Sequence, residues 1–331
     1  MGAFSARETQ DGGVFIVELL DEERGQRARI LPSAGANCYA YESRHRGQVF
    51  QLLEKTEPKT AADNPTGRGI PILFPFPNRV RNGAWTFRGK TYQFENVQAA
   101  GHHLHGLVYN RQWTVQSLEA GEEFAACSMS FDAESAEGVL EQYPFPFHLT
   151  AAYTLAGGAL QLTFSALNAG GEDMPMGVGF HPYFSAPIGE ETDPSDCIAT
   201  VPADAYWELD ELLPTGRILP VFDSFDLRQG QPFEGMSFDD LFTQVSHEKS
   251  GVSRCSIEDR AIRLRTVLES GKEFRELVLY TPPNRRSLCI EPYTCPTDAA
   301  NLEARGIEAG LIVLPPGGVF TGSICIYPEA F

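Results

Sequence analysis

Residues 161–167 read QLTFSAL, and the pattern in this stretch decides the fold class. Leu162 and Phe164 alternate with polar neighbours, so an extended chain would carry apolar side chains on one face and polar side chains on the other. This alternation predicts a β-strand that buries one face and exposes the other face to water.

The same two-residue period recurs on both sides of this stretch. In residues 84–94, AWTFRGKTYQF, two alternating arms flank the turn Arg88-Gly89-Lys90, which predicts a hairpin. Residues 322–328, GSICIYP, alternate again near the C-terminus. The 31 glycines and 23 prolines punctuate such runs, as is typical of many strands joined by turns.

Apolar spacing of the helical type is scarce in this chain. Residues 49–55 and 236–245 are the stretches compatible with short helical turns. No repeat, low-complexity block or clear linker divides the sequence. We therefore expect a single all-β domain over residues 1–331, built as a large sandwich of two antiparallel sheets. The strand topology does not follow from the pattern.

The bulk composition narrows the classes of partner. A net charge of −18 at pH 7 would repel phosphate backbones and anionic lipid, so we expect no nucleic-acid and no membrane partner. No run of 18 apolar residues occurs, and residues 1–13 lack the basic and apolar regions of a signal peptide. The seven cysteines form no C-x-x-C pair, which favours free thiols in a reducing compartment. The sequence therefore predicts a cytoplasmic protein.

Polar side chains set among aromatic residues, prolines and glycines mark the candidate site. Such segments are typical of strand ends and loops whose rigid backbones hold polar groups in place. The segments are residues 74–83 (FPFPNRVRNG), 101–106 (GHHLHG), 179–184 (GFHPYF), 289–296 (CIEPYTCP) and, more weakly, 237–242 (SFDDLF).

His181 and Glu291 are the candidate proton-transfer groups. An imidazole titrates near ~6.5 and exchanges protons at neutral pH, although a core histidine bonded to a backbone carbonyl would have the same local sequence. Glu291 ends an apolar run, where a carboxylate needs a partner. It is either a general base or the salt-bridge partner of Arg285 or Arg286.

Three further residues are candidates for holding a ligand. The guanidinium fork of Arg79 could hold adjacent hydroxyls or a phosphate. His105 could hydrogen-bond a hydroxyl, whereas a zinc site made with His103 would have no local acidic or cysteine ligand, so we expect no metal. Asp239 and Asp240 could both cap a short helix, or one of them could bind two sugar hydroxyls.

Signatures of other chemistries are absent from the sequence. It contains no G-x-S-x-G elbow, no P-loop and no H-E-x-x-H motif. We therefore expect no cofactor.

Taken together, these segments resemble the aldose 1-epimerase (galactose mutarotase-like) family over most of the chain. The first half carries GIPILFPFPNRVRNG, FRGKTYQF and HLHGLVYNRQW in the order seen in the family. The second half carries GFHPYF, LPTGRILPV, FDLRQG, FDDLF and IEPYTCPTDAAN, again in that order.

The resemblance implies a galactose mutarotase-like β-supersandwich with an open carbohydrate cleft and no cofactor. It assigns His181 as the catalytic acid and Glu291 as the catalytic base. It also places Arg79, His105 and Asp239 at sugar-binding positions.

The implied reaction interconverts the α and β anomers of a free hexose. An ionised Glu291, with a reference pKa near ~4.3, would take the anomeric hydroxyl proton while a protonated His181 donates to the ring oxygen. The C1–C2 bond then rotates and the ring closes on the opposite face of the aldehyde. The partner is thus expected to be a small-molecule aldose.

Two other functions fit the same scaffold. In a hexose-6-phosphate 1-epimerase, Arg79, Arg81 and Arg111 would contact the phosphate. A non-catalytic carbohydrate-binding protein would need neither His181 nor Glu291. The sequence names no particular sugar.

Overall fold

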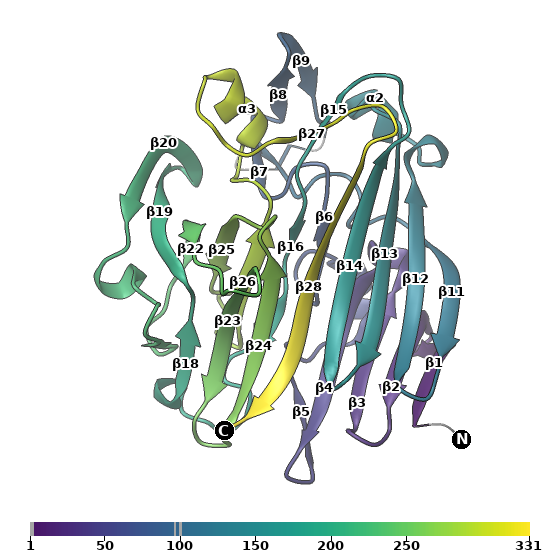
Figure 1. Ribbon diagram of the computed structural model, residues 1–331, viewed down its shortest axis with the longest axis vertical. Coiled ribbons are helices and arrows are strands. Elements are labelled where there is room, and N and C mark those ends of the chain that lie inside the picture. The colour runs from purple at the N-terminus through teal and green to yellow at the C-terminus, as the bar shows by residue number, and fades with distance from the viewer. Residues whose placement is uncertain (1–2, 96, 99–100) are drawn as a thin grey trace.

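The structure is a computed structural model that describes residues 3–95, 97–98 and 101–331. Residues 1–2 of the N-terminal stretch, residue 96 and residues 99–100 lie outside the described part. Antiparallel strands dominate the fold, and the predicted all-β class with a large sandwich is confirmed (Figure 1). The helices of the described residues are short: α1 (Pro58–Asp63), α2 (Val139–Gln142), α3 (Ala299–Ala304), and the 3-10 turns η1 (Pro32–Ala34), η2 (Ala133–Ser135), η3 (Pro194–Asp196) and η4 (Asp223–Phe225).

A nine-stranded sheet forms one layer. Its strands, in spatial order, are β11 (Thr114–Ala120), β12 (Phe124–Asp132), β13 (Phe147–Ala156), β14 (Ala159–Asn168), β28 (Val319–Ala330), β24 (Leu264–Gly271), β23 (Val252–Asp259), β18 (Cys197–Thr200) and β21 (Gln231–Pro232). The predicted strand at 161–167 lies within β14, where buried and more exposed residues alternate. Period-2 patterning thus located a strand that has one face in the core.

Two further sheets form the opposite layer. A five-stranded sheet contains, in order, β1 (Phe4–Asp11), β2 (Val14–Asp21), β3 (Gln26–Leu31), β4 (Asn37–His45) and β5 (Gln48–Gln51). The other sheet runs β20 (Leu213–Pro220), β19 (Ala203–Asp210), β22 (Asp239–Val245), β25 (Glu276–Tyr280), β26 (Ser287–Tyr293), β16 (Gly179–Phe180) and β6 (Ile72–Leu73), with β17 (Tyr183–Ser185) also paired to β26. Figure 1 shows the five-stranded sheet behind β12–β14 and the β26-containing sheet behind β23 and β24.

Small two-stranded sheets complete the fold. They are β7 (Arg79–Arg81) with β10 (His102–Leu104), β8 (Ala84–Phe87) with β9 (Lys90–Gln93), and β15 (Met174–Met176) with β27 (Ile312–Leu314). The β8–β9 pair is the hairpin that the sequence predicts, with Trp85 opposite Tyr92.

The two stretches compatible with helical turns contain strands instead. Residues 49–55 include most of β5, and residues 236–245 include β22. β22 pairs with β19 on one side and with β25 on the other, so its backbone hydrogen bonds are supplied by strands distant in sequence. Short apolar runs fit a strand or a helix equally well, and tertiary pairing decided the outcome here.

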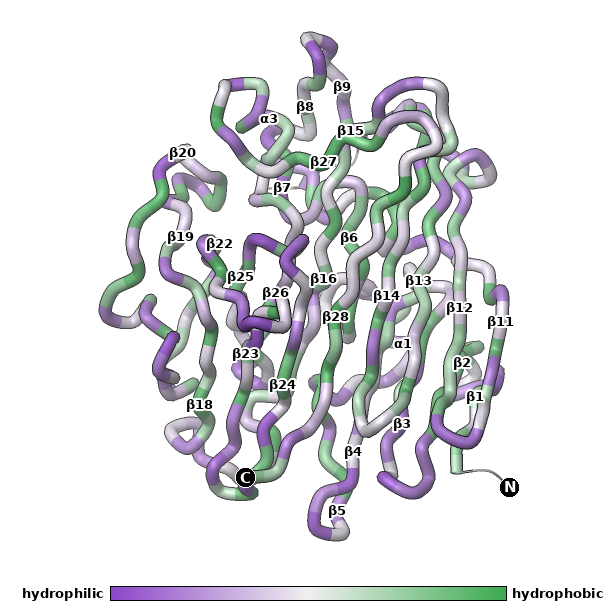
Figure 2. Tube along the Cα trace, in the orientation of Figure 1, coloured by the Kyte–Doolittle hydropathy of each residue, from purple (hydrophilic) through white to green (hydrophobic). Residues whose placement is uncertain are grey.

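Hydrophobic packing holds the layers together. A continuous cluster of buried residues joins strands of both layers, with Phe74 and Phe147 at a ring-centroid distance of 4.8 Å. Figure 2 shows hydrophobic and hydrophilic residues interleaved along the strands rather than gathered into long segments. Among the described residues, no helix combines the length and the apolar character that a membrane crossing requires.

Strand β26 has one face in this cluster and the other face turned away from it. Leu288 and Ile290 belong to the main cluster between the layers. The alternate residues Cys289, Glu291 and Tyr293 point to the opposite face, since side chains alternate along a strand. A smaller buried cluster, which includes Trp207, Leu241, Val278 and Tyr293, packs on that opposite face. The sheet therefore has a second buried environment, and the candidate site lies beside it.

Candidate active site

The pairing register of β26 brings His181 and Glu291 face to face. Gly179 of β16 pairs with Tyr293, and Tyr183 of β17 pairs with Cys289. Counting inward from both pairs in this antiparallel register places His181 opposite Glu291. Their side chains meet, with Nε2 of His181 at 3.3 Å from Oε1 of Glu291. Two residues 110 positions apart thus become direct neighbours.

Burial sets the proton affinity of both groups. The side chains of His181 and Glu291 are only 6% and 1% exposed. Loss of water disfavours charge, so it raises the pKa of Glu291 well above its usual range and lowers the pKa of His181 to about 3.

These directions differ from the sequence-based expectation of an ionised glutamate and a protonated histidine. A protonated Glu291 beside a neutral His181 holds the same number of protons as an ionised Glu291 beside a protonated His181. The two states differ only by the transfer of one proton across the 3.3 Å contact. The pair therefore carries one transferable proton at neutral pH.

Aromatic residues fix the orientation of the pair. Tyr293 Oη donates to Oε2 of Glu291 at 2.5 Å, which leaves Oε1 toward the histidine. The imidazole of His181 stacks on the Tyr183 ring with centroids 4.6 Å apart and planes within 2°. Tyr183 is itself held by a hydrogen bond from its hydroxyl to the carbonyl of Thr66, at 2.7 Å.

The structural alternatives for the two residues are not observed. Within the described part of the chain, Nδ1 of His181 is buried and has no hydrogen-bond partner, so no backbone carbonyl satisfies the ring. Arg285 donates to the carbonyl oxygens of Met236 and Phe233, and the side chain of Arg286 is exposed. Among the described residues, neither arginine forms an ion pair with Glu291, whose partner is His181.

Arg79 and Asp239 form the more exposed side of the site. Nη2 of Arg79 lies 3.2 Å from Oδ2 of Asp239, and their side chains are 20% and 32% exposed. Nη1 of Arg79 donates to Oδ1 of Asn78 at 3.0 Å. Asp239 begins strand β22, so the interpretation that it caps a helix is wrong. Both residues present charged groups next to the buried pair.

His105 completes the set of predicted residues. Its ring centroid lies 5.4 Å from that of His181 in an edge-on arrangement, and burial lowers its pKa well below the usual range. The backbone turns here, since His105 has φ 68° and donates its N–H to the carbonyl of Asn78 at 2.8 Å. The next residue must be glycine, because a Cβ on Gly106 would stand 2.1 Å from the carbonyl oxygen of Phe74.

The other histidines of the 101–106 segment are separate from this group. His103 stacks on Phe94 at 4.2 Å, and the ring of His102 accepts a hydrogen bond from the N–H of Asn82. β10 ends at Leu104, before the turn at His105, so the simple strand alternation of His103 and His105 does not hold. A zinc site made from these two residues has no support in the geometry.

Sequence reasoning missed three residues of the site. Tyr293 and Cys289 flank Glu291 at two-residue spacing on the same strand face, and Tyr183 lies across from Cys289. The ligand atoms of His181, Cys289 and Glu291 lie within 4.8 Å of one another. Extending the strand alternation outward from Glu291 would have identified Tyr293 and Cys289, because both follow from i ± 2 spacing.

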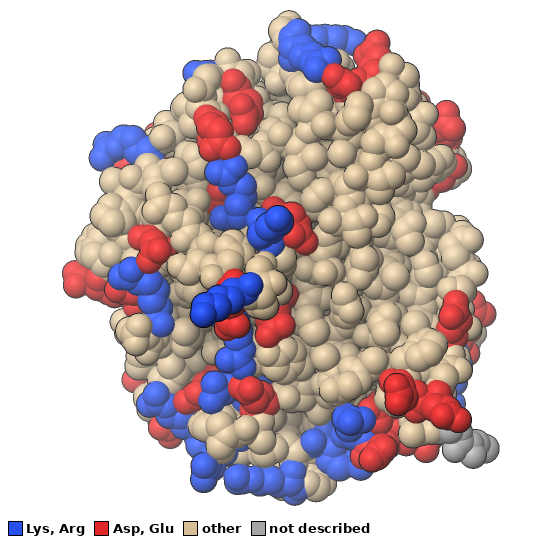
Figure 3. All heavy atoms as spheres, in the orientation of Figure 1, with Lys and Arg blue, Asp and Glu red and all other residues tan. Residues whose placement is uncertain are grey.

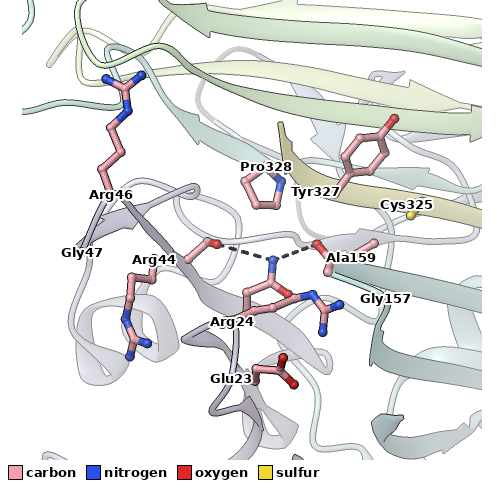
Figure 4. A pocket seen from close by; sticks show the side chains of 13 residues that line it. Glu23, Arg24, Arg44, Arg46, Gly47, Gly157, Ala159, Cys325, Tyr327 and Pro328 are labelled. Atoms are coloured by element: carbon pink, nitrogen blue, oxygen red, sulfur yellow. Dashed lines mark hydrogen bonds between the residues drawn. The ribbon is translucent and has the colours of Figure 1, made fainter. Parts of the chain in front are cut away.

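A surface cavity elsewhere shares no residue with this group. It has a volume of about 690 Å³ and is lined by Arg24 of the β2–β3 turn, Arg44 of β4 and Arg46 of the β4–β5 turn (Figure 4). None of the five predicted residues lines it. The convergence of polar side chains, rather than cavity size, identifies the candidate site.

Known proteins resemble this chain in sequence. The sequence profile of the aldose 1-epimerase family matches residues 24–327. Uncharacterized protein YihR of Escherichia coli (strain K12) is 25% identical over 266 residues, which cover 76% of this chain and 78% of that protein. Galactose mutarotase of Rattus norvegicus is 34% identical over 157 residues, which cover 46% of this chain and 43% of the rat protein.

Solved structures share the fold. A galactose mutarotase-like protein from Clostridium acetobutylicum aligns with a TM-score of 0.89 and 24% identity over 99% of both chains. A putative aldose 1-epimerase from Escherichia coli K12 aligns with a TM-score of 0.74 and 20% identity over 99% of this chain and 100% of that chain. These likenesses confirm the galactose mutarotase-like fold.

Proposed function

Because this chain belongs to the aldose 1-epimerase family, we propose that it interconverts the α and β anomers of a free hexose by acid–base ring opening and closure. The observation that carries the proposal is the buried contact of His181 and Glu291, 3.3 Å between Nε2 and Oε1. The anomeric hydroxyl and the ring oxygen are bonded to the same carbon, so two neighbouring proton-transfer groups can serve both.

The proposed mechanism uses the single proton of the pair. The proton of Glu291 first crosses the 3.3 Å contact to His181. The imidazolium then delivers this proton to the ring oxygen while the Glu291 carboxylate takes the proton of the anomeric hydroxyl, and the C1–O bond of the ring breaks. After rotation about C1–C2, the same two groups act in reverse and close the ring on the other face. Each group returns to its starting state, so neither a metal nor a redox partner takes part.

Arg79, His105 and Asp239 are proposed to hold the sugar. The neutral imidazole of His105 has one donor and one acceptor, which suits a hydroxyl group. Arg79 and Asp239 supply donors and acceptors in fixed positions because each already holds the other at 3.2 Å. The positive charge of Arg79 is offset by Asp239, and this pairing favours a neutral hydroxyl over a phosphate. The favoured substrate is therefore a free aldose.

The whole chain, residues 1–331, acts as one domain in the cytoplasm. Its partner is a small sugar, with no nucleic acid, membrane or cofactor involved.

Polarimetry tests the proposal directly. Fresh α-D-glucose and α-D-galactose are followed to equilibrium with the wild-type protein, with Glu291→Gln and with His181→Asn. We expect wild-type acceleration on a free sugar and a near-complete loss in both variants, which circular dichroism should show to be folded. A parallel assay with α-D-glucose 6-phosphate identifies a phosphosugar enzyme, and binding of a sugar without acceleration would overturn the catalytic proposal.

A further inference from the structure

A buried thiol lies beside the proton-transfer pair. Cys289 is a free cysteine, fully buried, and its Sγ lies within 4.8 Å of both Nε2 or Nδ1 of His181 and a carboxylate oxygen of Glu291. The proposed reaction uses the histidine and the glutamate but gives the thiol no role. We propose that His181, Cys289 and Glu291 form a binding site for one Zn²⁺ ion, and that occupation of this site inhibits the enzyme.

The backbone itself assembles the three ligands. Cys289 and Glu291 are two residues apart on β26 and so share a face of the sheet. His181 lies between β16 and β17, which both pair with β26. Three donors therefore come from two adjacent extended segments whose register is fixed by hydrogen bonds. A site built in this way needs no loop to fold over the ion.

The distances are close to those of a tetrahedral zinc site. Bond lengths of about 2.0–2.3 Å and tetrahedral angles place the ligand atoms about 3.3–3.6 Å apart. His181 Nε2 and Glu291 Oε1 already lie 3.3 Å apart. The thiol lies within 4.8 Å of its partners, so a side-chain shift of roughly 1 Å brings it into range.

The chemistry of the donor set favours zinc over magnesium or calcium. Imidazole and thiolate are soft or borderline ligands, which suit Zn²⁺, whereas the hard cations take oxygen ligands. Glu291 is the one carboxylate in the set, and Tyr293 holds its other oxygen at 2.5 Å. On binding, the thiol and the protonated carboxyl each release one proton to solvent, and the fourth position stays open for water or a sugar hydroxyl.

The surrounding charge does not oppose a cation. Two arginines act electrostatically on Glu291 or Cys289, and each already faces a carboxylate: Arg79 lies 3.2 Å from Asp239, and Arg68 lies 3.8 Å from Glu54. Cys289 and Glu291 would supply two negative charges once deprotonated, which balance the charge of Zn²⁺. The imidazole remains neutral in such a site.

Inhibition follows from the identity of the ligands and rests on the proposed function. An ion bound to Nε2 and to Oε1 occupies the atoms that would exchange protons with the sugar. The enzyme could then neither protonate the ring oxygen nor accept the hydroxyl proton.

Co²⁺ spectroscopy tests the site without any reference to activity. Co²⁺ is added to chelator-treated full-length protein, because tetrahedral Co²⁺ bound to a thiolate gives visible ligand-field bands and a near-ultraviolet thiolate charge-transfer band. We expect saturation at one equivalent in the wild type and displacement of the signal by Zn²⁺. Absence of the thiolate band at saturating Co²⁺ would overturn the site.

Cysteine variants provide the matched comparison. Cys289→Ser should lose the charge-transfer band and weaken Co²⁺ binding by about 10–100-fold or more, and His181→Asn should weaken binding similarly. Cys325→Ser, which changes the partly buried thiol in β28, should retain both the band and the affinity. If Cys289→Ser is unstable, Cys289→Ala replaces it, with fold checked by circular dichroism. A band that persists without Cys289 would disprove the assignment.

A kinetic assay then separates the two proposals. With each rate normalised to that protein's own metal-free rate, Zn²⁺ should slow mutarotation by the wild type and by Cys325→Ser but have little effect on Cys289→Ser. If metal-free protein fails to accelerate mutarotation while the Co²⁺ signal appears as expected, the proposed function fails and the metal site stands. If mutarotation occurs but Zn²⁺ has no effect, the inhibitory site is wrong and the function stands.

Discussion

Strands β14 and β26 have the same geometry but different surroundings. In β14, residues on one face are buried and those on the other are at least partly exposed, whereas every residue of β26 is buried. The outward-facing Thr163 and Ser165 of β14 meet solvent, and Figure 3 shows few charged side chains over β12–β14 and β28. The corresponding face of β26 carries Cys289 and Glu291, which meet other side chains instead of water. A polar group on a strand buried on both faces needs a protein partner, and here the partner is His181.

The largest effect is expected from Glu291→Gln. The substitution keeps the shape of the side chain and an oxygen that accepts from Tyr293, but it removes the exchangeable carboxyl proton. We expect the catalysed rate to fall by about 10²–10⁴-fold, the usual contribution of a general acid or base. Polarimetry measures the rate, and urea unfolding should show a folded variant. An unchanged rate would exclude Glu291 from the chemistry.

Leu162→Ala tests the opposite strand. Leu162 is 1% exposed in the main core, so its truncation should lower the free energy of unfolding by about 2–5 kcal/mol. Because the side chain is remote from the site, KM should stay unchanged in the folded protein. Urea denaturation measures the free energy of unfolding, and initial-rate polarimetry measures KM. A loss of activity without a loss of stability would contradict the division between the two strands.

Glu276 in β25 is a second buried carboxyl, and it pairs across the sheet with Tyr293 of β26. It accepts from Nε1 of Trp207 at 3.0 Å, and burial raises its pKa from 4.5 to about 7. Between these values the folded state keeps a proton that the unfolded state has lost. This difference contributes about 3 kcal/mol to the free energy of unfolding. The contribution is fully present below about pH 4.5 and is lost as the pH rises through about 7.

Glu276→Gln should therefore flatten the pH dependence of stability. The amide can still accept from Trp207, but it does not titrate. Urea unfolding of both proteins at about pH 5 and about pH 8 measures the difference. Parallel pH profiles for the wild type and the variant would show that Glu276 titrates normally.

The pH–rate profile tests the environment of the pair. Burial lowers the pKa of His181 from 6.5 to about 3 and raises the pKa of Glu291, so the pair should keep its single proton across the neutral and mildly acidic range. We expect kcat/KM to stay nearly constant between about pH 7 and about pH 5. A decline that begins near pH 6.5 would instead indicate a histidine with ordinary solvation.

Thr163→Ala should have the smallest effect. Thr163 lies on the outward face of β14, directly between the buried Leu162 and Phe164. Surface substitutions of this kind change stability by about 0.5 kcal/mol or less. Urea denaturation beside Leu162→Ala gives the matched control, and a loss comparable to that of Leu162→Ala would show that the outer face of β14 is not a solvent face.

Local sequence was enough to predict the strands that have one face in the core and one face in water, and to name the candidate residues of the site. Alternation at Leu162 and Phe164 reflects a boundary between core and water, which every residue of the strand experiences locally. The hairpin at residues 84–94 was also predictable, because its turn and both arms lie within a few residues. The five predicted site residues stood out because polar groups are unusual beside apolar and aromatic runs.

Pairing between strands that are distant in sequence is established only in the folded chain. The register that sets His181 opposite Glu291 is fixed by β16, β17 and β26, which no local pattern relates to one another. The same pairing removes water from both groups, and this desolvation moves their pKa values away from those expected from residue type. It also made residues 239–245 a strand, because neighbouring strands supply the backbone hydrogen bonds. Hydrogen bonding and solvent exclusion between remote segments are properties of the folded chain, and local sequence does not encode them.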